Sequence, residues 1–163
     1  MAEDDDFTRF VVESYASLIR RAFLLVGDQG RAEDLVQTSL MSLYPRWGRV
    51  QEPAAYLRTV MTRTAIGWRA RRWTRELPTE AMPEVGMTHD QTSELELADS
   101  VRRALTELPA AQRAVVVLRY FEDCSEVETA RVLGCSVGTV KSRASRALAA
   151  LRAGGLLAEE GVR

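Results

Sequence analysis

The sequence has few of the residues that most often carry chemistry: one histidine, His89, and two cysteines, Cys124 and Cys135. The cysteines are eleven residues apart and the histidine is distant, so no four-ligand zinc set forms locally. Free thiols are the favoured interpretation, and a disulfide is the alternative that a reducing cytoplasm disfavours. No glycine-rich phosphate loop and no paired nucleophile and base are present either. The sequence therefore predicts no cofactor, no metal and no catalysis.

Long apolar runs are also missing. The longest, such as 22–26 and 114–118, contain about five residues, whereas a membrane-spanning helix needs roughly 20. The chain begins with four acids at positions 3–6, the opposite of the positively charged start of a signal peptide. With 163 residues, 46% of them hydrophobic, we expect a soluble cytoplasmic protein of one or two small domains.

A net charge of −1 argues by itself against a nucleic-acid-binding protein. The basic residues are nevertheless clustered, because residues 53–75 and 131–152 contain no acid. All but one of the 22 basic residues are arginines, a bias more typical of a GC-rich genome than of a function. The clustering is the stronger signal, and it predicts two basic surfaces.

Apolar residues in the first half recur at three- and four-residue intervals, which predicts three amphipathic helices. They are expected over residues 7–26, from about 30 to 45, and from 53 onward. Tyr44 is expected to be buried at the end of the second helix. Pro53 suits the first position of the third, where Arg58 and Thr62 should share an outward face away from the apolar stripe.

Between residues 76 and 94 the apolar period disappears and prolines, acids and a glycine take its place, which indicates a flexible linker. Beyond it, residues 95–122 keep helical spacing, although Val115 to Leu118 could also form a buried strand. The predicted fold class is all-α: a three-helix domain over 7–75, the linker over 76–94, and a second helical domain over 95–153.

The second domain ends in a short helix over 125–133 that should bury Val127, a left-handed turn at Gly134, and a longer helix capped by Ser136. This is the helix-turn-helix layout. Its second helix enters the major groove N-terminus first, and here its outward positions carry base- and phosphate-binding groups without an acid. The candidate DNA-binding residues are Ser136, Thr139, Lys141, Ser142, Arg143 and Arg146. The alternative is an ordinary solvated helix face.

The arginines at the end of the third helix are mixed with aromatic residues, a combination that suits melted or single-stranded nucleic acid. The candidates are Trp47, Arg58, Arg63, Arg69, Arg72 and Trp73. Trp68 lies on the apolar stripe and is assigned to the core, whereas Trp47 could instead close the end of the helix bundle. Asp34 and Gln37, one turn apart on the second helix, look like plain surface from the residues alone.

Three segments are similar to extracytoplasmic-function sigma factors of the sigma-70 family. Residues 32–37 (AEDLVQ) resemble region 2.2, residues 108–113 (LPAAQR) the start of region 4.1, and residues 133–143 (LGCSVGTVKSR) region 4.2. Residues 55–58 and 68–73 resemble the corresponding segments of the SigE-like group of actinobacteria, a group that also fits the arginine bias. The resemblance implies an alternative sigma factor that binds core RNA polymerase and directs promoter-specific transcription initiation.

The resemblance also implies roles for particular residues. The region 2.2 helix would dock on the beta-prime clamp helices of polymerase through Asp34, Leu35 and Gln37, with the beta flap as a second polymerase contact. Residues 45–72 would open and read the minus-10 element, with a flipped-out base in the loop 47–52, and the helix-turn-helix would bind the minus-35 element. Many family members carry an asparagine near Arg63, and this helix has none.

The implied partners are therefore core polymerase and promoter DNA, with an anti-sigma protein as a further candidate and with no membrane or small-molecule substrate. A rival interpretation is a dimeric helix-turn-helix repressor or activator. It explains the last helix but gives no role to the arginine-aromatic segment or to the helix of Asp34. It also needs a dimer interface, for which no heptad pattern is visible.

Overall fold

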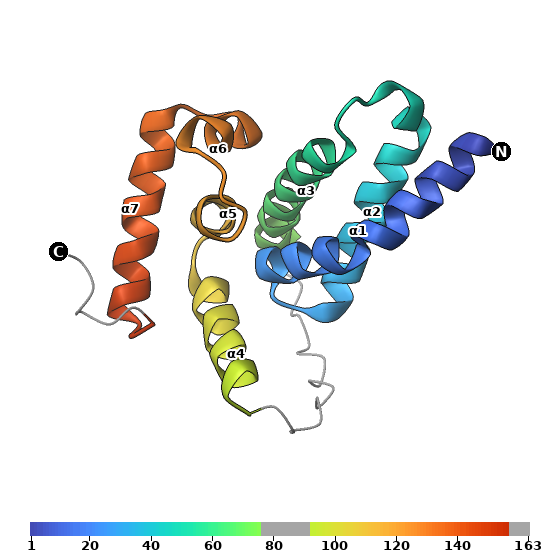
Figure 1. The fold of residues 1–163 in the computed structure, drawn as a ribbon. Helices are drawn as coiled ribbons and strands as arrows, with labels where there is room; N and C mark the ends of the chain where they lie inside the picture. Colours follow the sequence, from blue (N-terminus) through green and yellow to red (C-terminus); the bar gives the residue numbers. More distant parts are fainter. Residues whose placement is uncertain (76–91, 157–163) are drawn as a thin grey trace.

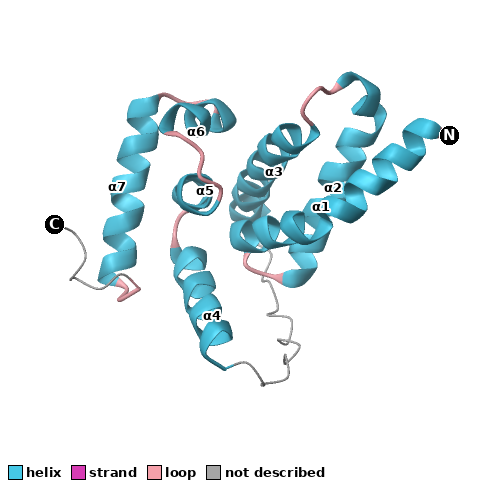
Figure 2. Ribbon diagram, viewed as in Figure 1, coloured by secondary structure: helices cyan, strands magenta, loops and turns pink. Residues whose placement is uncertain are grey.

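The computed structural model describes residues 1–75 and 92–156, and the side chains of 1–68 and 98–156 within them. The described residues are helical and contain no strand (Figures 1 and 2). The elements are α1 (Ala2–Val26), α2 (Gln29–Leu43), η1 (Tyr44–Arg49), α3 (Pro53–Arg75), α4 (Thr92–Glu107), α5 (Ala110–Val116), η2 (Val117–Phe121), α6 (Glu126–Leu133) and α7 (Val137–Ala153). The predicted all-α fold is confirmed, as is helix rather than strand at 115–118.

Helices α1, α2 and α3 form the first domain, as the three apolar stripes predict. Between α1 and α2 the chain turns within two residues: Gly27 ends α1 in the left-handed conformation with φ 77°, and the Asp28 side chain accepts a hydrogen bond from the Arg31 N–H at 3.1 Å. The turn brings the apolar faces together around a core that includes Leu18, Leu25, Leu35, Leu43, Leu57 and Met61. Of the predicted linker, residues 76–91 lie outside the described residues, and α4 already begins at Thr92.

Two burial predictions for this domain are wrong. Tyr44 is 52% exposed because α2 ends one residue earlier, and its hydroxyl donates to Asp4 Oδ1 at 2.8 Å. Thr62 is buried, and its hydroxyl donates to the Arg58 carbonyl at 2.7 Å, one turn back in α3. Burial of a hydroxyl is tolerated there because the helix itself supplies the acceptor.

The second domain consists of α4 to α7, with α5 lying between α3 and α7 (Figure 1). Helix α6 begins with a capping box, in which the Ser125 N–H donates to Glu128 Oε2 at 2.8 Å and the Glu128 N–H donates to Ser125 Oγ at 3.0 Å. The first bond lowers the pKa of Glu128. Val127 is 56% exposed instead of buried, because the inner face of α6 is centred on Thr129, Ala130 and Val132.

The chain widens into a π turn over Val117–Phe121, where the Glu122 N–H donates to the Val117 carbonyl at 3.1 Å, five residues back. Such turns add one residue to a helical turn and are frequent at functional sites. Here the turn carries Glu122 toward the first domain.

The two domains share a continuous core. Ala114 and Val117 of the second domain are fully buried within the hydrophobic cluster of the first. Beside them Arg113, 3% exposed, donates to the Leu25 carbonyl at 2.8 Å and the Leu105 carbonyl at 2.6 Å. Helix α3 packs on α5 and α6, and α1 packs on α4 and α5 (Figure 2). No helix among the described residues is long and apolar enough to cross a membrane.

Leu35→Ala should lower the free energy of unfolding by about 2–5 kcal/mol, because Leu35 is fully buried and the substitution leaves a cavity. Met41→Ala on the exposed face of the same helix should change it by less than about 0.5 kcal/mol. Urea denaturation followed by circular dichroism measures both. Equal, small changes would contradict the placement of Leu35 in the core.

Candidate nucleic-acid and polymerase interfaces

The N-terminus of α7 is held by Ser136 and Thr139. Gly134, at φ 65°, reverses the chain after α6, and Ser136 Oγ then accepts a hydrogen bond from the Thr139 N–H at 3.1 Å. The two hydroxyl oxygens are 2.9 Å apart. The predicted helix-turn-helix is thus present, and two of the six candidate DNA-binding side chains also take part in its cap.

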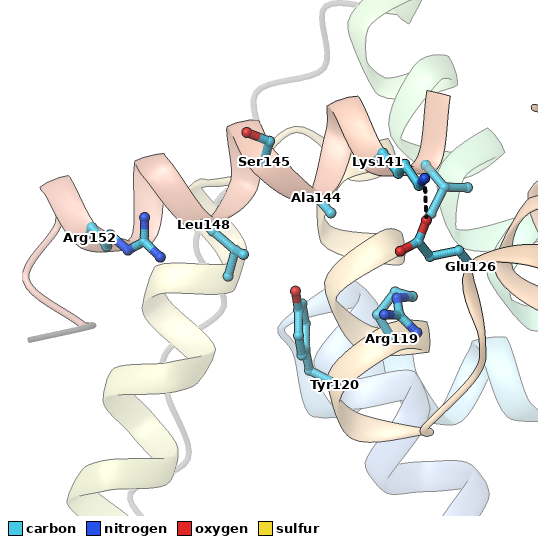
Figure 3. A pocket seen from close by; sticks show the side chains of 9 residues that line it. Arg119, Tyr120, Glu126, Lys141, Ala144, Ser145, Leu148 and Arg152 are labelled. Atoms are coloured by element: carbon cyan, nitrogen blue, oxygen red, sulfur yellow. Dashed lines mark ion pairs between the residues drawn. The ribbon is translucent and has the colours of Figure 1, made fainter. Parts of the chain in front are cut away.

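Lys141, Ser142 and Arg146 are exposed on α7, and Arg143 is half-buried. The structure corrects the expectation that this surface is free of acids. Glu126 of α6 lies across from it, with its Oε2 3.7 Å from Lys141 Nζ (Figure 3). The pair is well exposed, so solvent weakens it and leaves the lysine able to exchange partners.

A hollow lies beside this pair, between α7 and the end of the π turn. Its walls carry Arg119 and Tyr120 on one side and Leu148 and Arg152 of α7 on the other (Figure 3). Arg119 Nη1 donates to the Cys124 carbonyl at 2.6 Å, which fixes the guanidinium at the base of the turn. The hollow therefore combines basic groups with an apolar wall.

On α3, the two candidate arginines whose side chains are described contact the second domain. Arg58 Nε donates to Glu122 Oε2 at 3.0 Å. Arg63 Nε donates to the Val132 carbonyl at 2.8 Å, and its Nη2 donates to the Arg131 carbonyl at 3.4 Å, near the end of α6. The side chains of Arg69, Arg72 and Trp73 lie outside the described residues. The structure thus pairs Arg58 and Arg63 with groups of the same chain.

Trp47 packs at the end of the helix bundle, which was the alternative interpretation of this residue. Its ring lies 5.2 Å from that of Phe7 and 5.1 Å from that of Phe10, centroid to centroid, where it closes the end of the bundle. Trp68 is half-buried and packs on the core of the first domain, as predicted.

Sequence reasoning missed Glu122 and Arg21. The Arg21 Nε donates to Glu122 Oε1, so one carboxylate receives a guanidinium from α1 and another from α3. Burial, and after it the nearby charge of Arg58, lowers the pKa of Arg21 to about 10, so the group stays protonated at neutral pH. No local signal could have found this cluster, since 101 residues separate Arg21 from Glu122.

The other candidate surface is on α2. Asp34 and Gln37 are exposed and line a shallow hollow with Arg31, Met41 and Trp68. Leu35, the third residue expected to contact polymerase, is fully buried and presents no surface to a partner in this structure. Its position in the core instead holds the turn of α2 that presents Asp34.

Comparison with known proteins identifies both domains. The family model Sigma-70 region 2 matches residues 11–75, and the model Sigma-70, region 4 matches residues 98–151. The RNA polymerase sigma-E factor of Streptomyces coelicolor is 42% identical over 155 residues, which cover 93% of this chain and 87% of the relative. The chain belongs to the sigma-70 family.

Further similarities assign this sigma factor to the extracytoplasmic-function group. The ECF RNA polymerase sigma factor SigM of Mycobacterium tuberculosis is 34% identical over 148 residues, covering 89% of this chain and 74% of the relative. The sigma factor RpoE in its complex with the anti-sigma factor NepR, from Bartonella quintana, superposes with a TM-score of 0.73 at 29% identity, covering 96% of this chain and 99% of that chain. The resemblance seen in the sequence is confirmed, and a dimeric repressor is not favoured, because the relatives span both domains.

Ser136→Ala should cost about 1 kcal/mol of stability, because the Thr139 N–H loses its acceptor. Ser136→Asp should restore the stability, since a carboxylate caps as well and suits the positive helix end. It should also weaken binding to duplex DNA, because the new charge faces phosphates. Thermal denaturation and fluorescence anisotropy separate the two effects. Unchanged DNA affinity of Ser136→Asp would mean that this end of α7 does not approach the backbone.

Proposed function

We propose that this chain binds core RNA polymerase as its sigma subunit and directs promoter-specific initiation, with no catalytic step of its own. The observation that carries the proposal is the presence in one chain of a region 2 bundle and a region 4 helix-turn-helix, matched together by sigma-E factors over nearly their whole length. Transcription takes place in the cytoplasm, so that is the compartment proposed.

Polymerase docking is proposed for the exposed face of α2. Asp34 and Gln37 supply hydrogen-bonding groups at the rim of the hollow, while Met41 and Trp68 supply apolar surface beside them. A polar rim around a small apolar centre is the usual composition of a protein–protein interface. The proposed partner surface is the clamp-helix coiled coil of the beta-prime subunit, and Leu35 acts only by supporting α2 from the core.

Recognition of the minus-35 element is proposed for α7. Lys141, Ser142 and Arg146 are exposed along it, so they can reach base edges and phosphates when the helix lies in the major groove. Ser136 and Thr139 order the helix end, whose N–H groups favour a phosphate. Arg143, half-buried, completes the candidate set. On binding, the Lys141 ammonium group would leave the Glu126 carboxylate and pair with a DNA group instead.

Binding of the melted minus-10 element is proposed for residues 45–72 with Trp73. Trp47 would support the loop that receives a flipped base, and the arginines of α3, Arg58 and Arg63 among them, would hold phosphates. Each module alone makes few phosphate contacts and binds weakly. Attachment to polymerase, at the clamp helices and the beta flap, would fix both modules at promoter spacing and so raise their effective concentration.

An anti-sigma protein is a candidate partner as well. The similar solved structures are complexes of RpoE with the anti-sigma factor NepR and of CnrH with the cytosolic domain of CnrY, the latter at a TM-score of 0.63 and 25% identity. We infer that the present chain could be held by a protein of this kind.

Replacing Asp34 and Gln37 together by Ala should weaken binding to core polymerase about tenfold or more, since two interface hydrogen-bonding groups are lost, one of them charged. Titration of labelled protein with sigma-free core polymerase measures the affinity. The control is Glu33→Ala, which removes an exposed acid from the same helix but does not line the hollow. Wild-type affinity of the double variant would remove α2 from the docking surface.

Arg146→Ala should lower initiation about fivefold or more at a promoter selected with the wild-type holoenzyme, because an arginine contact to DNA is worth roughly 1–3 kcal/mol. Affinity for core polymerase should stay unchanged. Arg103→Ala, an exposed arginine of α4 paired with Asp99, is the matched control. Equal losses of initiation and of polymerase binding by Arg146→Ala would overturn its assignment to DNA.

A further inference from the structure

The contact between the two domains is strongly charged at one place. Glu122 is only 10% exposed, and its two carboxylate oxygens accept from Arg21 of α1 and Arg58 of α3, whose side chains are 13% and 30% exposed. We call these three residues the Glu122 cluster. A carboxylate that is nearly removed from water depends on such partners, and both of them belong to the other domain.

A second polar contact lies at the C-terminal end of α6. The carbonyls there carry the negative end of the helix dipole, and the capping Gly134 N–H reaches that of Arg131 only at 3.4 Å. Arg63 of α3 donates to two of them, those of Arg131 and Val132. The first helix of the helix-turn-helix is therefore tied to α3 next to the Glu122 cluster.

Two of the arginines that make these contacts, Arg58 and Arg63, are also the proposed ligands of the minus-10 strand. A guanidinium directed at Glu122 or at the end of α6 is not available to a phosphate, and α5 and α6 occupy the side of α3 on which it lies. In contrast, Asp34 and Gln37 of α2 stay exposed for docking, and the exposed residues proposed for the minus-35 element on α7 are Lys141, Ser142 and Arg146. The arrangement thus engages Arg58 and Arg63 of the proposed minus-10 surface and leaves α2 and α7 accessible to their proposed partners.

We propose that the Glu122 cluster and the contact of Arg63 with the end of α6 are together autoinhibitory: region 4 of the same chain holds Arg58 and Arg63 in place of single-stranded DNA, and the two states exclude each other. The inference rests on the proposed function, which assigns these arginines to the melted strand. Opening also uncovers Ala114 and Val117, so the charged contacts act together with an apolar one. The apparent association constant for single-stranded DNA is then the intrinsic constant of the open form multiplied by the fraction of molecules that are open.

The test compares Glu122→Gln with Asp123→Asn in the full-length chain. Both remove one negative charge at neighbouring positions, but Asp123 is exposed, and its φ of 52° is a conformation that asparagine tolerates. Glu122→Gln should increase the radius of gyration measured by small-angle X-ray scattering. It should also raise affinity for a short fluorescent single-stranded oligonucleotide by roughly three- to tenfold, leaving affinity for a mixed-sequence duplex unchanged. Asp123→Asn should leave all three quantities at wild-type values.

Arg21→Gln supplies an independent variant, because loss of the Arg21 guanidinium weakens the same cluster and Arg21 is not a proposed DNA ligand. It should open the chain and raise single-strand affinity, although it removes a positive charge that DNA would otherwise attract. Thermal denaturation verifies that each variant is folded.

An unchanged radius and unchanged single-strand affinity in folded Glu122→Gln and Arg21→Gln would overturn the proposal. So would an equal gain by Asp123→Asn, or an equal gain on duplex DNA, because either would reduce the effect to bulk charge. If the variants open and gain single-strand affinity while neither they nor the wild type binds core polymerase, the autoinhibitory contact stands and the sigma assignment fails.

Discussion

Arg113 has a buried guanidinium, and backbone carbonyls at the ends of two helices surround it. It donates to Leu105, Thr106 and Leu108 at the end of α4, and to Leu25 at the end of α1. These oxygens lie at the negative ends of two helix dipoles, where the guanidinium adds donors to the one that the Leu108 N–H supplies to the Leu105 carbonyl at 3.1 Å. The position of α5 between the two domains, and with it the placement of Glu122, depends on this one side chain.

Most of the helices could be predicted from sequence because their signals are local. Apolar spacing, Pro53 at a first helical position, and Gly134 before the Ser136 cap each act over one or two turns. The misassigned residues lie at the borders of the apolar stripes. Periodicity gives the width of a stripe but not which of its edges faces a neighbouring helix. It therefore predicts burial of Tyr44 and Val127 and exposure of Thr62, whereas the packing exposes the first two side chains and buries the third.

The candidate sites were predictable to the extent that they lie on a single helix. The exposed residues of α7 follow from its sequence, and so does the surface position of Asp34 and Gln37. Contacts between distant segments did not follow: Glu126 reaches Lys141 from the preceding helix, and Glu122 reaches two arginines of the other domain. A chain that looks acid-free over 131–152 can therefore still carry a carboxylate beside its basic surface once the helices are packed.

The π turn over Val117–Phe121 gives the link between the domains an unusual sensitivity to chain length. It contains one residue more than an α-helical turn, and that residue sets the direction in which Glu122 leaves the helix. Loss of a single residue here would restore a regular helix and rotate the following chain by about 100°. The charged contact would be lost while every residue that forms it remained, so a deletion of one codon could uncouple the domains where a substitution would only weaken them.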